Sequence, residues 1–291
     1  MQITVKHSSI VVDEYEAGMS PILERTFTIY DPLTHQGYIK GIDYNEETKR
    51  LIVPRGIDIG WLEYQLQCKA YTDTHCDPYL TFPEMIMVKY PPKNERQQET
   101  LQFMVGADPY RHNAYKSQLC VNNNTGEGKT WACITAACCL NMRAIVITAQ
   151  INWLEQWKNR ILEYTDLYNR DILMLTSSAS INRILREGVP ANCRFILASH
   201  STIANYGKQC GWEAVGELFK IMQVGLKFYD EAHLYFDNMC KIDFYTNTFR
   251  TYYVSATLAR SNKDEDIIFK YYIKNVPIIT FFDPEVDPHT K

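Results

Sequence analysis

The sequence predicts an α/β protein in which helices cover both faces of a parallel β-sheet, preceded by a small, strand-rich α+β domain. After residue 100, short continuous apolar runs alternate with amphipathic, helix-like stretches, as expected for strands that are buried on both faces. Before residue 90, the runs are rich in β-branched and aromatic residues and are bounded by turn-forming residues. These two residue patterns predict two structurally different parts in one chain.

Three segments near the N-terminus predict short strands. They are RTFTIYD, GYIKGIDY and KRLIVPRG, which are bounded by Asp-Pro, Asn-Glu-Glu and Pro-Arg-Gly breaks. The following stretch, GWLEYQLQCKAY, predicts a short helix with Leu62, Leu66 and Ala70 on one stripe.

Residues 89–100, KYPPKNERQQET, combine Pro-Pro with a charged run and predict a domain boundary. The expected domains are therefore residues 1–92 and residues 93–291. The predicted strands of the second domain are AIVITA (144–149), RFILASH (194–200), GLKFYDE (225–231) and RTYYVSAT (250–257). Its predicted helices include NWLEQWKNRILEYT, SINRILREG and WEAVGELFKIMQ. Strands that alternate with helices favour a parallel sheet.

Composition narrows the class of protein. The net charge of the 291 residues is -4, so any nucleic-acid contact must come from a local patch of charge. Nine cysteines, an odd count without a CxxC pair, disfavour both a secreted disulfide framework and a structural zinc site. Neither a signal pattern nor an apolar run long enough to span a bilayer is present, so a cytoplasmic location (host cytoplasm for a viral protein) is expected.

The segment NNNTGEGKTWAC (122–133) predicts a phosphate-binding loop, or P-loop. Gly126 and Gly128 allow backbone N–H groups to turn inward around an anion. Lys129 opens the predicted helix TWACITAACCL and is placed to meet β- and γ-phosphates, while the Thr130 hydroxyl suits Mg²⁺. The expected cofactors are ATP and Mg²⁺, contacted by Asn124, Thr125, Gly126, Glu127, Gly128, Lys129 and Thr130.

Asn123 stands where the usual eight-residue form of this loop has its first glycine. Asparagine tolerates left-handed backbone better than other non-glycine residues, so we expect the loop to survive this change. A glycine-rich turn with a chance lysine is the alternative, and the strand SQLCVN before it and the helix after it disfavour that alternative.

A second chemical signal is the strand VGLKFYDEAH, which ends in Asp230 and Glu231. Adjacent residues at a strand end point in different directions, so the two carboxylates can take two roles. We expect Asp230 to hold the metal ion and Glu231 to polarise an attacking water molecule. Without a P-loop upstream, a solvated acidic turn would be the better interpretation.

Asp230-Glu231-Ala232-His233 resembles the DEAH box of superfamily 2 helicases and translocases, and Ser255-Ala256-Thr257 resembles their SAT motif, in the family's order and spacing. The resemblance covers residues from about 95 to 291 and implies the first RecA-like lobe of such a motor. It implies catalytic roles for Lys129, Asp230 and Glu231. It also implies that His233, Ser255 and Thr257 couple nucleotide state to movement between lobes; a satisfied strand-end histidine is the alternative for His233.

Two further segments, IVITAQINWLEQW and LASHSTI, resemble the family's segments after the second and third strands. Their candidate contacts to a nucleic-acid backbone are Thr148, Gln150, Ser199 and Ser201, although local capping explains these side chains equally well. The LEQW tetrapeptide in the first of these segments resembles the Snf-type and XPB-like branch of the superfamily. ERQQETLQFMVG resembles the segment whose glutamine reads adenine, with Gln98 as the candidate and Gln97 as its rival.

Family motors use two RecA-like lobes, and no motif of the second lobe follows the SAT segment in this sequence. We therefore expect half of a motor: either part of a longer protein or one half of a split helicase. The first 90 residues resemble the small domain that phage recombination helicases use on branched DNA, which implies phosphate contacts from Lys49, Arg50 and Arg55. A packing domain without a DNA role remains the alternative.

The predicted function is that of an ATP-dependent DNA helicase or translocase that remodels or unwinds branched or duplex DNA. Its expected partners are branched or single-stranded DNA and a second RecA-like lobe, with no membrane. The alternative is a nucleotide-responsive module that binds DNA or protein without motor activity of its own.

Overall fold

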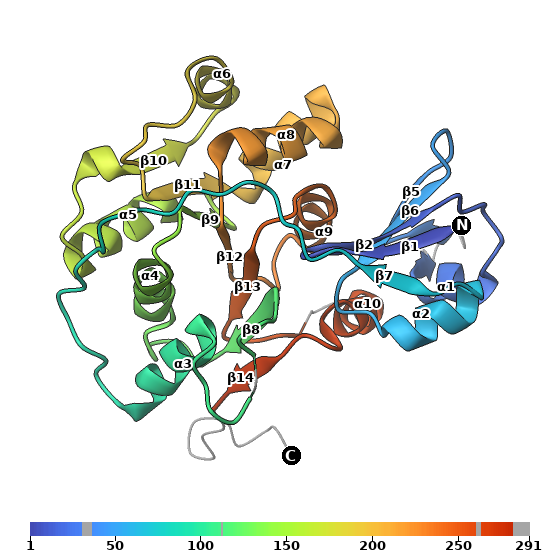
Figure 1. The fold of residues 1–291 in the computed structure, drawn as a ribbon, viewed down its shortest axis with the longest axis horizontal. Helices are drawn as coiled ribbons and strands as arrows, with labels where there is room; N and C mark the ends of the chain where they lie inside the picture. The colour runs from blue at the N-terminus through green and yellow to red at the C-terminus, as the bar shows by residue number, and fades with distance from the viewer. Residues whose placement is uncertain (31–36, 112, 260–262, 282–291) are drawn as a thin grey trace.

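The computed structural model describes residues 1–30, 37–111, 113–259 and 263–281. Figure 1 shows a large α/β body joined to a smaller sheet formed by the N-terminal part of the chain.

The α/β body is built on a seven-stranded sheet in the order β10-β11-β9-β12-β13-β8-β14. Every neighbouring pair in it is parallel, so the carboxyl ends of its strands share one edge. The strands are β8 (Gln118–Asn122), β9 (Ala144–Thr148), β10 (Ile172–Leu175), β11 (Phe195–Ser199), β12 (Leu226–Asp230), β13 (Arg250–Ser255) and β14 (Ile278–Thr280).

Helices cover both faces of this sheet, and successive strand residues point into two different hydrophobic clusters (Figure 1). Ile145 and Ile147 of β9 belong to one cluster, whereas Ala144 and Val146 belong to the other. One face carries α3 (Glu95–Val105), α4 (Lys129–Leu140) and α5 (Trp153–Tyr164). The other carries α6 (Ser178–Glu187), α7 (His200–Cys210), α8 (Trp212–Met222), α9 (Phe236–Tyr245) and α10 (Lys263–Ile273). A 3-10 turn, η1 (Asn169–Asp171), precedes β10.

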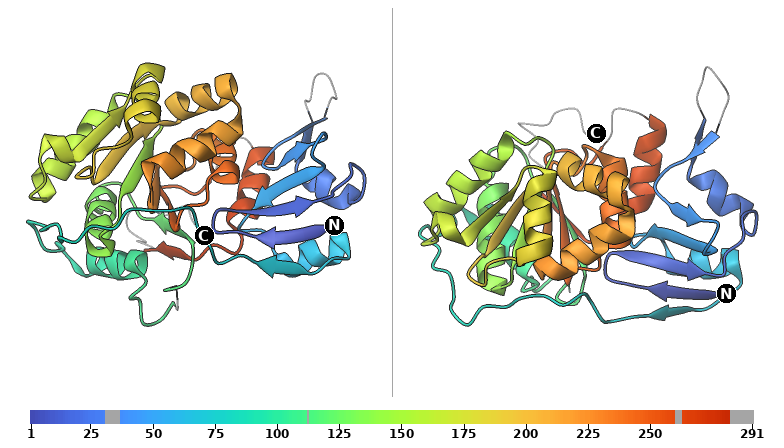
Figure 2. Two further views of the ribbon diagram at one scale, coloured as in Figure 1. Left: turned by 45° about the horizontal axis from the view of Figure 1, so that its top comes forward. Right: turned by 90° about the horizontal axis from the view of Figure 1, so that it is seen from above.

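The smaller sheet has the order β5-β6-β2-β1-β7 and is antiparallel except at its β1–β7 edge. Its strands are β1 (Gln2–Val5), β2 (Ser9–Asp13), β5 (Asp43–Asn45), β6 (Arg50–Pro54) and β7 (Ala70–Thr72). Two short helices, α1 (Pro21–Thr26) and α2 (Ile59–Leu66), and the hairpin β3 (Thr28–Tyr30) and β4 (Gly37–Ile39) complete this part. The sheet packs beside α9 and α10, as both views in Figure 2 show, and its apolar side chains join the cluster on that face.

The predicted fold class is confirmed: a RecA-like parallel sheet with helices on both faces follows a small, strand-rich α+β part. The sequence patterns nevertheless missed β1, β2, β10, α7 and α9. Ala70 lies in β7 and not on α2, because Gln67 adopts a left-handed conformation (φ 49°) that ends the helix after Leu66. RTFTIYD begins in α1, which Ser20 caps by accepting a hydrogen bond from Leu23 N; Asp31 of that segment lies outside the described residues.

Hydrogen bonds attach the smaller sheet to the amino-terminal edge of the larger one. The His7 ring nitrogens lie 2.9 Å from the Phe249 carbonyl oxygen and 3.0 Å from that of Thr74. Gln118 Nε2 donates to the Ser8 carbonyl at 3.1 Å. These contacts join the turn between β1 and β2 directly to β8 and to the start of β13.

The chain crosses between the two sheets soon after Thr72. Thr81 pairs with Met142 and Val88 with Thr165, in isolated bridges that place this connecting segment against the α/β body. The Pro-Pro pair of the predicted boundary therefore lies within the surface of that body, some way beyond the crossing.

A buried polar network joins β12, β13, α9 and α10. The Asp243 carboxylate accepts hydrogen bonds from Tyr229 (2.8 Å), Tyr253 (2.6 Å) and Tyr272 (2.5 Å), and it pairs with Lys227 at 2.6 Å. All five side chains are completely buried. Burial and the carboxylate raise the pKa values of the three phenols far above their ordinary range, so these groups stay protonated as donors.

Within the described ranges, no helix is both long and apolar enough to cross a membrane.

Candidate nucleotide-binding site

The predicted P-loop connects β8 to α4 at the carboxyl edge of the sheet. Gly126 (φ 89°) and Gly128 (φ 84°) both adopt left-handed backbone, which glycine reaches with little strain. Gly128 occupies the N-cap of α4 and provides no side-chain acceptor for the first turn. The N–H groups that begin α4 are therefore directed toward the loop, as an anion site at a helix N-terminus requires.

The Glu127 carboxylate holds the loop closed and does not line the cavity. It accepts hydrogen bonds from Arg96 Nη1 and from the Asn124 backbone N–H, each at 3.0 Å. A carboxylate would also repel phosphate oxygens. These contacts favour a structural role for the Glu127 side chain.

Asn123, which stands in place of the usual first glycine of the loop, does not adopt the left-handed backbone that its sequence position suggested. Its φ angle is not positive, so left-handed tolerance plays no part. The side chain is buried and donates from Nδ2 to Thr100 Oγ1 of α3 at 2.8 Å. Asn123 therefore links the loop to the neighbouring helix.

Lys129 projects over the loop and donates to the carbonyl oxygens of Asn123 (2.8 Å) and Asn124 (3.2 Å). Lys129 lines a cavity of about 890 Å³, whose walls come from three parts of the chain. The cavity is lined by the loop residues Thr125, Gly126, Gly128, Lys129 and Thr130, by Asp230 and Glu231, and by residues of α3, α5 and the segment before α3. The structure thus brings the predicted P-loop and the two DEAH-box carboxylates together.

Gln97, and not Gln98, faces this cavity. Gln97 is 6% exposed, accepts from Lys93 N at 2.9 Å and donates to the Glu127 carbonyl at 3.1 Å. Gln98 is exposed on α3, where its side chain does not line the cavity. The geometry therefore favours Gln97, the rival candidate, over Gln98.

Asp230 ends β12, and one of its oxygens, Oδ2, accepts a hydrogen bond from the Trp157 indole N–H at 2.8 Å. Burial raises the pKa of Asp230, while the indole N–H and the Lys129 charge act in the opposite direction. The next residue, Glu231, has φ 53°, an uncommon conformation for a residue with a side chain. This turn directs the Glu231 carboxylate away from Asp230 and toward β13.

His233, Ser255, Thr257 and Glu231 form one cluster. His233 Nδ1 lies 2.7 Å from Ser255 Oγ, and Ser255 Oγ donates to the Thr257 carbonyl at 2.6 Å. Glu231 Oε2 is 3.4 Å from both His233 Nδ1 and Ser255 Oγ. The residues expected to couple nucleotide state to movement are therefore in direct contact with the carboxylate expected to orient water.

The four candidate nucleic-acid contacts separate into two buried and two exposed residues. Thr148 and Ser199 are completely buried; the Thr148 hydroxyl bonds to the Gln150 carbonyl, and Ser199 caps α7 through Thr202 N. Local capping uses both hydroxyls, which favours the capping alternative for these two residues. Gln150 and Ser201 are exposed beyond the carboxyl ends of β9 and β11.

The basic cluster predicted near β6 offers little free positive charge. Lys49 pairs with Glu16 at 2.6 Å and Arg50 with Asp13 at 2.8 Å. Arg55 is largely buried, and burial lowers its pKa. The described contacts therefore favour a packing role for this strand.

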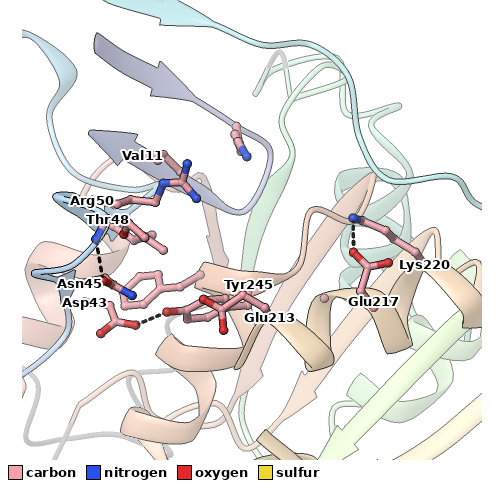
Figure 3. Close-up of a pocket in the computed structure, with 13 residues that line it drawn as sticks. Val11, Asp43, Asn45, Thr48, Arg50, Glu213, Glu217, Lys220 and Tyr245 are labelled. Carbon is pink, nitrogen blue, oxygen red and sulfur yellow. Dashed lines mark hydrogen bonds and ion pairs between the residues drawn. The ribbon is translucent and has the colours of Figure 1, made fainter. Parts of the chain in front are cut away.

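A second hollow lies between the smaller sheet and helices α8 and α9 (Figure 3). Several of its polar side chains bond to one another: Asp43 accepts from Tyr245 at 2.7 Å, and Lys220 pairs with Glu217 at 2.7 Å. It lacks a glycine-rich loop or a helix N-terminus directed into it, so the cavity at the P-loop is the better nucleotide site.

Comparison with known families decides the class of this site. The family model described as "Type III restriction enzyme, res subunit" (ResIII) matches residues 89–260, which is more than half of the chain and includes the P-loop, the DEAH box and the SAT segment. The chain belongs to the ResIII family of superfamily 2 helicases.

A curated relative of this ResIII protein is the general transcription and DNA repair factor IIH helicase/translocase subunit XPB of Danio rerio. The two are 29% identical over 110 residues, which is 37% of this chain and only 13% of the relative.

Solved structures show the same fold over nearly the whole chain. The UvsW helicase from bacteriophage T4 aligns with a TM-score of 0.60 and 15% identity, over 97% of this chain and 100% of that one. A second structure of T4 UvsW gives a TM-score of 0.59 at 15% identity, over 96% of this chain and 57% of that one. The likeness therefore includes the N-terminal sheet as well as the α/β body.

Proposed function

We propose that this ResIII-family protein binds ATP with Mg²⁺ and hydrolyses it to move along, remodel or unwind branched or duplex DNA. The observation that carries the proposal is the meeting of Lys129, Thr130, Asp230 and Glu231 in one cavity, at the carboxyl edge of a parallel sheet. Ligands of open α/β sheets bind at this edge.

The residues present fit a magnesium nucleotide. Hydroxyl and carboxylate oxygens, here of Thr130 and Asp230, are the ligands that Mg²⁺ prefers. A Cβ at Gly128 would lie 2.9 Å from Gln97 Cδ and closer still to Gln97 Nε2, so any larger residue there would displace the Gln97 side chain. At Gly126 nothing lies within 4 Å of an added Cβ, which leaves that side of the loop open.

When bound, Mg²⁺-ATP supplies the phosphoanhydride bond whose cleavage releases free energy for movement. The Lys129 ammonium neutralises charge on the β- and γ-phosphate oxygens. Thr130 and Asp230 hold the metal, Glu231 orients and polarises the attacking water, and Gln97 reads the adenine edge. The cluster of Glu231, His233 and Ser255 passes the change in nucleotide state to the end of β13.

We further propose that Gln150 and Ser201 contact the backbone of one DNA strand, because both are exposed beyond neighbouring strand ends. Backbone contacts carry little sequence information, so selectivity for DNA structure over sequence is expected.

The proposed organisation is an accessory part followed by the first RecA-like motor lobe. We place the boundary soon after Thr72, where the chain leaves the smaller sheet, and not at residue 92. A second RecA-like lobe, in a longer chain or a separate one, would supply the arginine that such motors use, which is worth about 10³–10⁵ in rate. A nucleotide-responsive binding module without motor activity is the second candidate, because the loop, Asp230 and Glu231 of this chain line one cavity by themselves.

Steady-state ATP hydrolysis, with and without branched DNA, tests the proposal, with Lys129→Ala as the control for contaminating activity. DNA-stimulated turnover that Lys129→Ala abolishes supports the motor function. Nucleotide binding without turnover, even after a second lobe is added, would favour the binding module.

A further inference from the structure

The buried indole of Trp157 contacts the proposed metal carboxylate, although the two residues lie 73 positions apart in the sequence. Trp157 is 4% exposed, and its Nε1–H donates to Asp230 Oδ2 at 2.8 Å. A metal ion held by one oxygen of this carboxylate would therefore use the other, Oδ1.

The helix that carries Trp157 is firmly held. Trp153 N, at the first turn of α5, donates to the Gln150 carbonyl at 3.2 Å. Leu154, Trp157 and Ile161 lie on one buried face of α5, at the spacing of successive helical turns. The indole N–H thus approaches Asp230 from a buried face of a packed helix.

The chemistry of the donor matters as much as its position. A charged donor at Oδ2 would neutralise the carboxylate and compete with a cation. The indole N–H is neutral, so it can fix the direction of the carboxylate while leaving its negative charge for the metal. A hydrogen-bond donor to a metal-ligating side chain orients that side chain and changes the affinity of the site for the metal.

We propose that Trp157 is a positioning residue that orients Asp230 for Mg²⁺; this inference rests on the proposed function, in which Asp230 is a metal ligand. The indole acts through Asp230 alone and touches neither nucleotide nor metal.

The test compares nucleotide affinity with and without the metal. Fluorescence anisotropy of a fluorescent, non-hydrolysable ATP analogue is measured in EDTA and in saturating Mg²⁺, and the ratio of the two affinities is the Mg²⁺ enhancement. Trp157→Phe keeps an aromatic ring but removes the N–H. We expect it to lower the enhancement about tenfold and to leave the affinity in EDTA unchanged. Trp212→Phe, on α8 at the opposite face of the sheet, is the matched control and should change neither quantity.

A double-mutant cycle with Asp230→Asn separates the possible failures. We expect Asp230→Asn to remove most of the enhancement and Trp157→Phe to have no further effect in that background. If Asp230→Asn leaves the enhancement intact, the proposed function itself fails. If Asp230→Asn abolishes it but Trp157→Phe has no effect, or lowers the affinity in EDTA equally, only the positioning role is overturned.

A second substitution guards against a folding defect in Trp157→Phe. Benzothienylalanine at position 157 has nearly the shape of tryptophan but carries sulfur in place of the N–H. It should reproduce the loss of Mg²⁺ enhancement with an unchanged melting temperature; a normal enhancement in this variant would contradict the proposal.

Discussion

Replacing Gly128 by alanine tests how tightly the P-loop is built against α3. The backbone there is left-handed (φ 84°), and the new Cβ would overlap the Gln97 amide. Gly126 provides a matched comparison in the same loop, because it is also left-handed (φ 89°) but has nothing within 4 Å of an added Cβ.

The expected magnitude follows from two contributions. Left-handed backbone costs a non-glycine residue about 1–2 kcal/mol, and this applies to both glycines. Only Gly128→Ala also displaces Gln97, which breaks its hydrogen bonds to Lys93 N and the Glu127 carbonyl, each worth about 1 kcal/mol. We therefore expect a loss of about 3–4 kcal/mol for Gly128→Ala and about 1–2 kcal/mol for Gly126→Ala.

Urea denaturation measures both losses, and Gln97→Ala removes the overlapping atoms. In the Gln97→Ala background, Gly128→Ala should cost no more than Gly126→Ala does in the wild-type chain. Equal losses in the free energy of unfolding for Gly128→Ala and Gly126→Ala in the wild-type background would refute the reasoning. In nucleotide binding, Gly128→Ala should also reduce any preference for ATP over GTP, because Gln97 is moved from its place.

Four further single substitutions, and one double substitution, have expected outcomes. Because burial raises the pKa of Asp230, its folded form resists ionisation, and stability is lost as pH rises from about 3.9 through the raised value. Asp230→Asn should therefore melt higher than the wild type at neutral pH, with the difference vanishing in acid; a lower melting temperature at pH 7 would contradict this. Asp243→Asn should destabilise the fold by about 3–5 kcal/mol in urea titrations, since it leaves Lys227 buried without its ion pair, and combining it with Lys227→Met should recover part of the loss. Ser199→Ala should cost about 1 kcal/mol as a lost helix cap, whereas Ser201→Ala should weaken DNA binding in gel-shift titrations without changing stability.

Local patterns were sufficient to predict the strands that carry the site. The runs ending in Asp230 and Ser255 are continuous and apolar, and the loop before Lys129 has its own glycine signature, so the chemistry could be placed on strand ends. The order of those strands in the sheet brought the side chains together as the resemblance implied.

Other features depend on packing that no local pattern records. Gln97 and Gln98 are adjacent on α3, and only the packing of the helix against the loop decides which of the two side chains is buried there. The burial of the Thr148 and Ser199 hydroxyls depends on how the strand ends are covered. The contact between Trp157 and Asp230 arises only when α5 packs on its face of the sheet beside α4 and β11, so the LEQW segment alone does not reveal it.

Isothermal titration calorimetry of Mg²⁺-ATP with the wild-type chain and with Lys129→Ala tests the central claim, that residues 123–130 bind a nucleotide's phosphates, most directly. The account predicts saturable binding at one site in the wild type and its loss in Lys129→Ala, with both proteins melting at the same temperature. Equal affinity in the two proteins, or saturable binding in neither, would contradict it.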